Sequence, residues 1–179
     1  MKSMINVIKS DIVAKYETSN FEKCSLDDAK GISLINNQAL IIYDFDLISD
    51  TIFSNFSSGC LNPKSLDSIY LELKDKLCFV EFKNSKWTSI DKDAVKMKIY
   101  ETLSLLSSYY EMDFSIFKYS KIFIIHKHDP KKSSAARKGL NGTCPGRFRL
   151  LEEMFKIKIA RYDALDFEEY LTRYSKLPV

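Results

Sequence analysis

The run at residues 119–125 constrains the fold of this chain more than any other segment. It is mostly apolar and rich in β-branched and aromatic residues, as is typical of a strand that is buried on both faces. Such a strand lies inside a sheet that has helices on each side, so the segment favours an α/β fold.

Helices are predicted where apolar residues recur at spacings of three and four. One helix is expected over residues 38–56 and a longer one over residues 90–111. Thr88 or Ser89 is the expected N-cap of the longer helix. The first apolar stripe consists of Ile41, Phe45, Ile48, Ile52 and Phe56. The second consists of Val95, Ile99, Leu103, Leu106 and Tyr110.

Two strand-like runs lie between these helices, at residues 68–73 and 77–83, and the residues at 74–76 read as a tight turn that joins them into a hairpin. The order of helices and strands along the chain therefore predicts a mixed central sheet flanked by helices on both sides.

The C-terminal third is expected to add a short helix near residues 148–155, a strand over residues 156–162 and a last helix. Asp166 and Glu169 are the expected capping pair of this last helix, which ends near Tyr174.

A length of 179 residues suits a single domain. Residues 38–175 are its expected core. Residues 1–37 are a weakly patterned N-terminal extension, with either a short helix or a strand near residues 4–16.

Hydrophobic residues make up 45% of the chain and charged residues 28%, which is typical of a folded globular protein. The formal net charge of +3 neither requires nor excludes nucleic acid. The N-terminus lacks the apolar stretch of a signal peptide, and no run approaches the length of a membrane span. We therefore expect a cytoplasmic protein without a membrane partner.

The four cysteines, Cys24, Cys60, Cys78 and Cys144, form no C-x-x-C pair, which argues against a zinc knuckle. We expect all four to be free thiols in a reducing compartment.

The second strand of the hairpin ends in two charged residues. Because side chains alternate along a strand, Glu81 and Lys83 share a face with the apolar residues Leu77 and Phe79. Burying charge is costly unless the charges pair or bind a metal, so this pattern marks a candidate site.

The first strand is expected to bring a third charged residue to the same place. If Leu73 pairs with Leu77 across a three-residue turn, Asp67 comes opposite Lys83 and Ile69 comes opposite Glu81. Two carboxylates suit Mg²⁺ or Mn²⁺, which can activate water and stabilise a transferring phosphoryl group. A neighbouring lysine can orient the water or stabilise the charged transition state.

These residues resemble the Asp…Glu-x-Lys signature of the PD-(D/E)xK, or restriction-endonuclease-like, nuclease superfamily. The resemblance covers about residues 38–175, although its specific part is the hairpin alone. It implies that Asp67, Glu81 and Lys83 are catalytic, that Asp67, Glu81 and the backbone carbonyl of Phe82 hold Mg²⁺ or Mn²⁺, and that DNA is the substrate. It also implies that such a small domain works as a homodimer.

The sequence departs from this signature in two respects. Leu66 stands where many members have proline. A further acidic ligand on the preceding helix is not evident, and Asp46 and Asp50 are the candidates for that role.

Basic residues near the motif and in the loop at 127–145 are candidates for contacts with nucleic-acid phosphates. They are Lys86, Lys92, Lys96, Lys127, Lys131, Lys132, Arg137 and Lys138. A solvated basic loop is the alternative for this segment. Trp87 is expected in the core rather than against a base.

Two other segments of the sequence resemble functional sites of other kinds. The residues at 39–46 resemble the strand and Asp-x-Asp of a haloacid-dehalogenase-like phosphatase, although the expected Gly-Thr does not follow. The segment His126-Lys127-His128-Asp129 offers metal ligands, but exposed polar residues at the end of a strand are the simpler interpretation.

Two further alternatives concern the hairpin itself. Glu81 and Lys83 could form an ordinary ion pair at a sheet edge, with Asp67 capping a loop. The domain could also be a catalytically silent nuclease fold that binds a protein partner, as an immunity protein, an inhibitor or a subunit of a defence or mobile-element system does.

Overall fold

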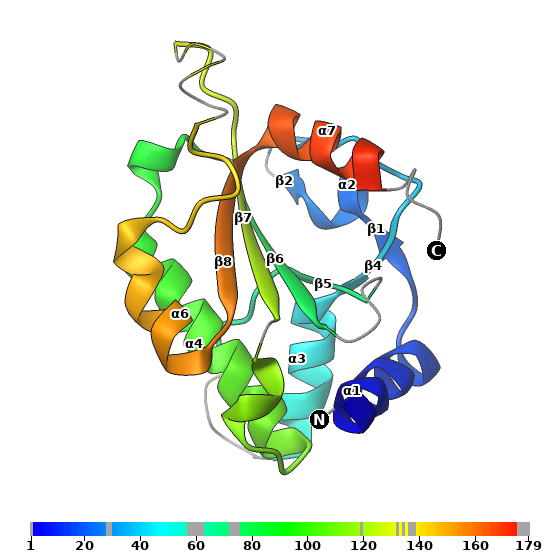
Figure 1. Ribbon diagram of the computed structural model, residues 1–179. Helices are drawn as coiled ribbons and strands as arrows, with labels where there is room; N and C mark the ends of the chain where they lie inside the picture. Colours follow the sequence, from blue (N-terminus) through cyan, green and yellow to red (C-terminus); the bar gives the residue numbers. More distant parts are fainter. Residues whose placement is uncertain are drawn as a thin grey trace.

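A mixed six-stranded sheet forms the centre of the computed structural model (Figure 1), with its strands in the order β1-β4-β5-β6-β7-β8. The strands β6, β7 and β8 are parallel to one another, and the other neighbours are antiparallel. The strands of this sheet are β1 (Ser19–Asn20), β4 (Ile41–Asp44), β5 (Ser68–Tyr70), β6 (Cys78–Lys83), β7 (Lys121–His126) and β8 (Lys158–Asp163). A separate two-stranded sheet consists of β2 (Leu26–Asp27) and β3 (Ile32–Ser33).

The structure describes residues 2–27, 30–56, 63–71, 76–118, 120–131, 133, 135 and 139–174. The α-helices are α1 (Lys2–Lys15), α2 (Phe21–Cys24), α3 (Phe45–Ser54), α4 (Lys92–Tyr109), α6 (Arg149–Phe155) and α7 (Ala164–Tyr174). Short 3₁₀ helices are η1 (Trp87–Ser89), η2 (Phe114–Phe117) and η3 (Gly146–Phe148). Within the described residues, no helix combines the length and the apolar character that crossing a membrane requires.

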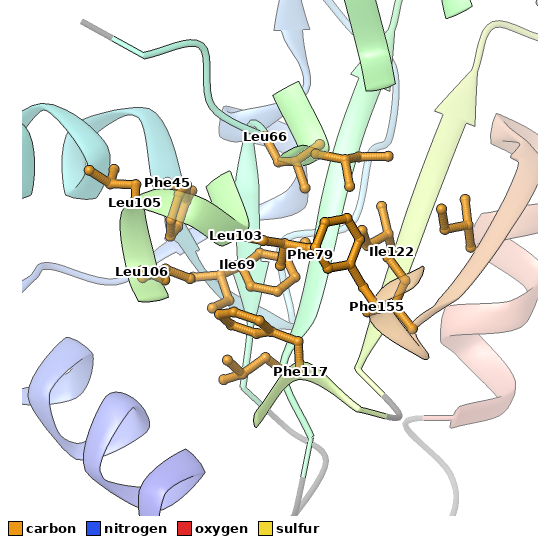
Figure 2. Close-up of a cluster of buried hydrophobic side chains, with 14 of the residues drawn as sticks. Phe45, Leu66, Ile69, Phe79, Leu103, Leu105, Leu106, Phe117, Ile122 and Phe155 are labelled. Atoms are coloured by element: carbon orange, nitrogen blue, oxygen red, sulfur yellow. The ribbon is translucent and has the colours of Figure 1, made fainter. Parts of the chain in front are cut away.

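Helices cover both faces of the sheet, with α1, α3, α4 and α6 on one side and α2 and α7 on the other (Figure 1). On the first side, Ile69 of β5, Phe79 of β6 and Ile122 of β7 pack against Leu103 of α4 (Figure 2). On the second side, Val80, Phe123 and Phe167 belong to a smaller cluster. Because both faces are buried, the central strands contain apolar residues at nearly every position, as the run at 119–125 predicts.

The predicted helix over residues 38–56 is wrong in its first part. Residues Ile41–Asp44 form β4, and α3 begins only at Phe45. The carboxylate of Asp44 accepts a hydrogen bond of 3.2 Å from the backbone N–H of Leu47 and so caps the helix. Ile41 is 59% exposed and therefore does not belong to the buried stripe that suggested a longer helix. The phosphatase alternative correctly expected a strand in this segment, whereas a phosphatase activity stays a prediction.

The second helix is close to its prediction, although its cap is different. Helix α4 begins at Lys92, and Asp91 caps it by accepting hydrogen bonds from the N–H groups of Asp93 and Ala94. Thr88 and Ser89 instead lie in η1. The preceding 3₁₀ turn moves the start of the helix two residues beyond the position that periodicity suggested.

The last helix also starts earlier than its predicted capping pair. Helix α7 begins at Ala164, and Asp163 accepts a hydrogen bond of 3.2 Å from the N–H of Leu165. Asp166 lies inside the first turn and accepts a bond of 2.5 Å from the Asn141 amide. Residues 2–15 form a helix, which confirms one of the two structures expected for the N-terminal segment.

The predicted hairpin is present, but its register differs by two residues. Ile69 lies opposite Phe79 rather than Glu81, and Ser68 lies opposite Val80. The expected pairing of Leu73 with Leu77 across a three-residue turn falls partly on residues 72–75, which lie outside the described residues. A shift of two residues keeps every side chain on its expected face, because the side-chain period of a strand is two.

Candidate functional site

Two carboxylates meet where β5 begins and β6 ends. Since Ser68 lies opposite Val80, the same register puts Asp67 level with Glu81. The Oδ2 atom of Asp67 accepts a hydrogen bond of 2.5 Å from the backbone N–H of Phe82, which fixes its carboxylate beside β6. The two-residue change in register thus brings the acids closer together than the sequence predicted.

Glu81 is fully buried although it carries an ionisable group. It projects from β6 on the same face as Phe79, toward the side of the sheet that α4 covers. Its Oε1 atom receives no hydrogen bond of good geometry in the described part of the chain, even though two ammonium groups lie within ion-pair distance. These two ammonium groups compensate the charge of the buried carboxylate in the folded protein.

Lys98 of α4 lies between the two carboxylates. Its Nζ atom is 2.8 Å from Asp67 Oδ1 and 3.1 Å from Glu81 Oε1. Lys98 is not among the residues that the hairpin motif predicts. Its position in the sequence is the feature that could have indicated it. Lys98 comes three residues after Val95 and directly before Ile99, on the face of α4 that packs into the core.

Lys83 completes the cluster from the end of β6. Its Nζ atom is 2.5 Å from Glu81 Oε1, and its side chain is 28% exposed, whereas Glu81 is inaccessible to solvent. The side chain of Lys83 therefore extends from the buried carboxylate of Glu81 to the protein surface. The structure brings together all three residues of the predicted motif, Asp67, Glu81 and Lys83.

The surroundings shift the pKa values of this cluster. Burial, followed by the nearby negative charge of Asp67, raises the pKa of Glu81 from 4.5 to about 7, against the opposite effect of Lys98 and Lys83. Burial lowers the pKa of Lys98, but the two carboxylates it contacts outweigh burial and raise it above its usual value. Lys98 is therefore a firmly charged cation, while Glu81 gains or loses a proton near neutral pH.

Asp46, in the first turn of α3, also faces this region. It lines a cavity of about 380 Å³ together with Asp44, Asp67 and Phe82. Its carboxylate accepts a hydrogen bond from the hydroxyl of Ser65. Burial and the proximity of Asp67 raise the pKa of Asp46. Asp50, the other candidate on this helix, does not line the cavity, although both acids are exposed in part.

The remaining wall of the cavity comes from the α2–β3 region. It consists of Lys23, Cys24, Ser25, Leu26, Asp27 and Leu34, and Asn84 closes it after β6. The amide of Asn84 donates a hydrogen bond of 2.5 Å to Asp27, which joins the small β2–β3 sheet to the end of β6. The N-terminal region, which the sequence left without a role, thus borders the candidate site.

The donors present fit a magnesium-like cation. Asp67 and Glu81 offer oxygen ligands on facing strands, and Mg²⁺ usually takes one or two carboxylates and keeps several waters. Within the described residues, no group of three or more histidine, cysteine, aspartate or glutamate side chains is arranged to hold a metal ion by itself. The site therefore suits a hydrated hard cation better than zinc, which prefers nitrogen and sulfur ligands.

The predicted phosphate-contacting lysines have varied surroundings. Lys86 forms an ion pair of 3.1 Å with Asp129, and Lys96 forms one of 2.7 Å with Asp93. The ammonium of Lys92 donates to the backbone carbonyl of Trp87 at 2.7 Å. Lys127 and Lys131 are exposed. Lys132, Arg137 and Lys138 lie outside the described residues.

The two histidines of segment 126–129 have different neighbours. His126 is buried at the end of β7, so its expected exposure is wrong, and its ring lies 5.6 Å from that of Trp87. His128 instead contacts the carboxylate of Asp163 at 3.1 Å. Trp87 packs against the larger core cluster, as expected.

The three described cysteines, Cys24, Cys78 and Cys144, are free thiols, and Cys60 lies outside the described residues. Comparisons with models of protein families, with curated proteins and with solved structures give no match to this chain.

Proposed function

We propose that this protein is a metal-dependent phosphodiesterase of the PD-(D/E)xK type that cleaves nucleic acid, with DNA as the expected substrate. The observation that carries this proposal is the convergence of Asp67 and Glu81 on a single ammonium group, with Lys83 beside them. Two facing carboxylates that share the ammonium of Lys98 have the oxygen ligands to bind a divalent metal ion in its place.

Asp67 and Glu81 would hold Mg²⁺ or Mn²⁺, with the Phe82 carbonyl as a further ligand. Asp46 lines the adjoining cavity and would bind the outer water shell of the ion. When bound, such an ion activates water and stabilises charge on the transferring phosphoryl group.

Lys83 would orient the attacking water and stabilise negative charge on the phosphate. Its ammonium suits this role because it touches Glu81 and is partly exposed, so it can reach a bound substrate. Hydrolysis would add water across the phosphodiester, so that one P–O bond forms and another breaks.

Lys98 occupies the position that a metal would need. In the proposed enzyme its ammonium holds the two carboxylates together before the ion binds and then moves aside. A flexible four-carbon side chain with 22% of its surface exposed allows this movement.

The order of elements is compatible with the restriction-endonuclease-like fold. A helix, α3, precedes the β5–β6 hairpin, and α4, β7, α6, β8 and α7 follow it. This agreement supports the resemblance, but the catalytic cluster carries the argument, since a fold by itself does not determine an activity.

The direct experiment incubates supercoiled plasmid with purified protein and Mg²⁺. We expect conversion to nicked and linear forms that EDTA abolishes. Lys83→Ala should lower the rate by about 10²–10³-fold, as expected for loss of a group that stabilises transition-state charge. Lys158→Ala, a matched change at an exposed position at the start of β8, should cleave like wild type. The absence of nicking by wild type, or equal nicking by Lys83→Ala, contradicts the proposal.

The same Lys98 contacts favour a second function. A cation supplied by the protein itself neutralises the two acids, as would suit a silent nuclease fold that acts through a protein partner. In that case Mn²⁺ would not bind at Asp67 and Glu81, no cleavage would occur, and a stoichiometric partner would co-purify with the chain. The metal-binding measurement therefore separates the two functions.

A further inference from the structure

A second charged residue lies in the same row of the sheet as Glu81. Glu81 is level with Ile124 of β7, and Ile124 is level with Arg161 of β8. Neighbouring strands are about 4.8 Å apart, so the backbones at Glu81 and Arg161 are separated by roughly 10 Å. Residues that are level on parallel strands share a face, so both side chains project toward the side of the sheet that α4 covers.

The guanidinium of Arg161 packs against the only tryptophan of the chain. Arg161 is 9% exposed, and its Cζ atom lies 4.9 Å from the centre of the Trp87 ring. The ammonium of Lys92 lies 5.2 Å from the centre of the same ring. Two cations thus gather at Trp87, near the start of the helix that carries Lys98.

Among the residues that the structure describes, no acid or carbonyl contacts this guanidinium. Across the described part of the chain, its N–H groups make neither a hydrogen bond nor an ion pair, and Arg161 bonds only through its backbone, to Thr143 and Gly142. The nearest acid along β8, Asp163, is engaged by the imidazole of His128 at 3.1 Å. Burial lowers the pKa of Arg161.

The N–H donors of this guanidinium stay within reach of solvent, although the residue as a whole is only 9% exposed. Its five donors and full charge lie over an aromatic ring, and no described acid or carbonyl compensates them. The arrangement therefore favours an acceptor supplied from outside the protein.

We propose that Arg161 binds a phosphate group, and that this phosphate belongs to the nucleic-acid strand whose reacting bond lies at Glu81. The planar fork of a guanidinium matches two phosphate oxygens, and Lys92 adds positive charge nearby. This inference rests on the proposed function for its substrate, but the anion site itself can be tested without cleavage.

The test uses the fluorescence of Trp87, which reports directly on its neighbour Arg161. Wild-type protein in EDTA is titrated with a short single-stranded oligonucleotide, with a mononucleotide and with inorganic phosphate. The affinity for a labelled oligonucleotide is measured in parallel by anisotropy. The variants are Arg161→Met, which keeps the length of the side chain, and Arg161→Lys, which keeps its charge. Arg173→Met, an exposed change on α7 with the same loss of charge, is the control.

We expect the oligonucleotide to change Trp87 emission saturably and the change to disappear in Arg161→Met. The anisotropy Kd should rise about tenfold or more in Arg161→Met and several-fold in Arg161→Lys, because charge-assisted hydrogen bonds are lost. Arg173→Met should bind like wild type. Equal affinity of wild type and Arg161→Met overturns the proposal; if that variant fails to fold, equal affinity of Arg161→Lys does so.

The three ligands separate the sources of the phosphate. Binding of the oligonucleotide much tighter than that of the small phosphates supports a nucleic-acid strand, whereas equal or tighter binding of the mononucleotide overturns that part of the proposal. Because EDTA removes divalent ions, this result is independent of plasmid cleavage. A phosphate site without Mg²⁺-dependent nicking would remove the proposed nuclease function and leave the Arg161 site in place.

Discussion

The Nζ atom of Lys98 lies 2.8 Å from the Oδ1 atom of Asp67, and the same ammonium contacts the buried carboxylate of Glu81. A helix residue thus provides the positive charge that holds two acids of a hairpin together. The proposed enzyme must exchange this ammonium for a divalent ion, so the behaviour of Lys98 decides between a catalytic and a purely structural cluster.

Lys98→Met should destabilise the metal-free protein and tighten metal binding. Removing the ammonium leaves two neighbouring carboxylates poorly compensated, which should cost about 2 kcal/mol once partial exposure of the site is considered. Thermal unfolding with and without Mn²⁺ measures both effects, and Mn²⁺ should raise the Tm of Lys98→Met more than that of wild type.

Lys96→Met is the matched control for this change. Lys96 lies on the same helix and pairs with Asp93, whose side chain is 72% exposed. Its loss should alter neither stability nor metal response. If Mn²⁺ raises the Tm of Lys98→Met no more than that of the control, the exchange of ammonium for metal does not occur.

The affinity for Mn²⁺ should depend on pH through Glu81. The pKa of Glu81 is raised to about 7, so below that pH a proton must leave the carboxyl before the ion can bind. The Kd should therefore rise about tenfold for each pH unit below 7 and change little above it. Calorimetric titrations from pH 5.5 to 8.5 measure this dependence; a flat profile contradicts the assignment of Glu81 as a ligand.

Glu81→Gln should change the pH dependence of stability. The folded-state pKa of Glu81 is above the ordinary value of 4.5, so its favourable contribution is complete below that value and is lost as pH rises through about 7. In EDTA, the Tm of Glu81→Gln relative to wild type should therefore increase from pH 5 to pH 8, by on the order of 5 °C.

Glu153→Gln, at an exposed position of α6, is the control for that measurement. Its Tm difference from wild type should be constant over the same pH range. If Glu81→Gln behaves in the same way as this control, Glu81 does not titrate abnormally in the folded protein.

Asp46→Asn should weaken Mn²⁺ binding, whereas Asp50→Asn should not. Asp46 lines the cavity beside Asp67, and Asp50 lies one turn further along α3, outside the cavity. Loss of an acid that orients the outer shell of a metal typically costs about tenfold or more in affinity. Titration of both variants at pH 8 distinguishes them, and equal affinities would remove Asp46 from the site.

The candidate site was largely predictable because its residues belong to one hairpin. The alternation of side chains along a strand is enough to put Glu81 and Lys83 on one face. Any register that differs by an even number of residues puts Asp67 on that face as well. The actual register, with Ile69 opposite Phe79, was not predictable, because apolar residues fill both faces of these strands and a shift of two leaves the pattern unchanged.

The residues that the sequence did not reveal come from elements distant along the chain. Lys98 reaches the hairpin from α4, and Arg161 reaches the same face from β8. Each interrupts an apolar pattern, but only the packing of α4 on the sheet and the parallel pairing of β6, β7 and β8 bring them to the face that carries Glu81. The strand β4 was hidden for a related reason: Ile41 repeats at helical spacing with Phe45, although Ile41 is exposed.

Diffraction from crystals soaked in Mn²⁺, recorded to reveal anomalous scattering, shows whether a divalent ion replaces the Lys98 ammonium between the two carboxylates. We predict a Mn²⁺ peak about 2.2 Å from carboxylate oxygens of both Asp67 and Glu81, with the Lys98 ammonium displaced from between them. A saturating soak that leaves Lys98 bridging the two carboxylates, with no peak at that position, would contradict the account.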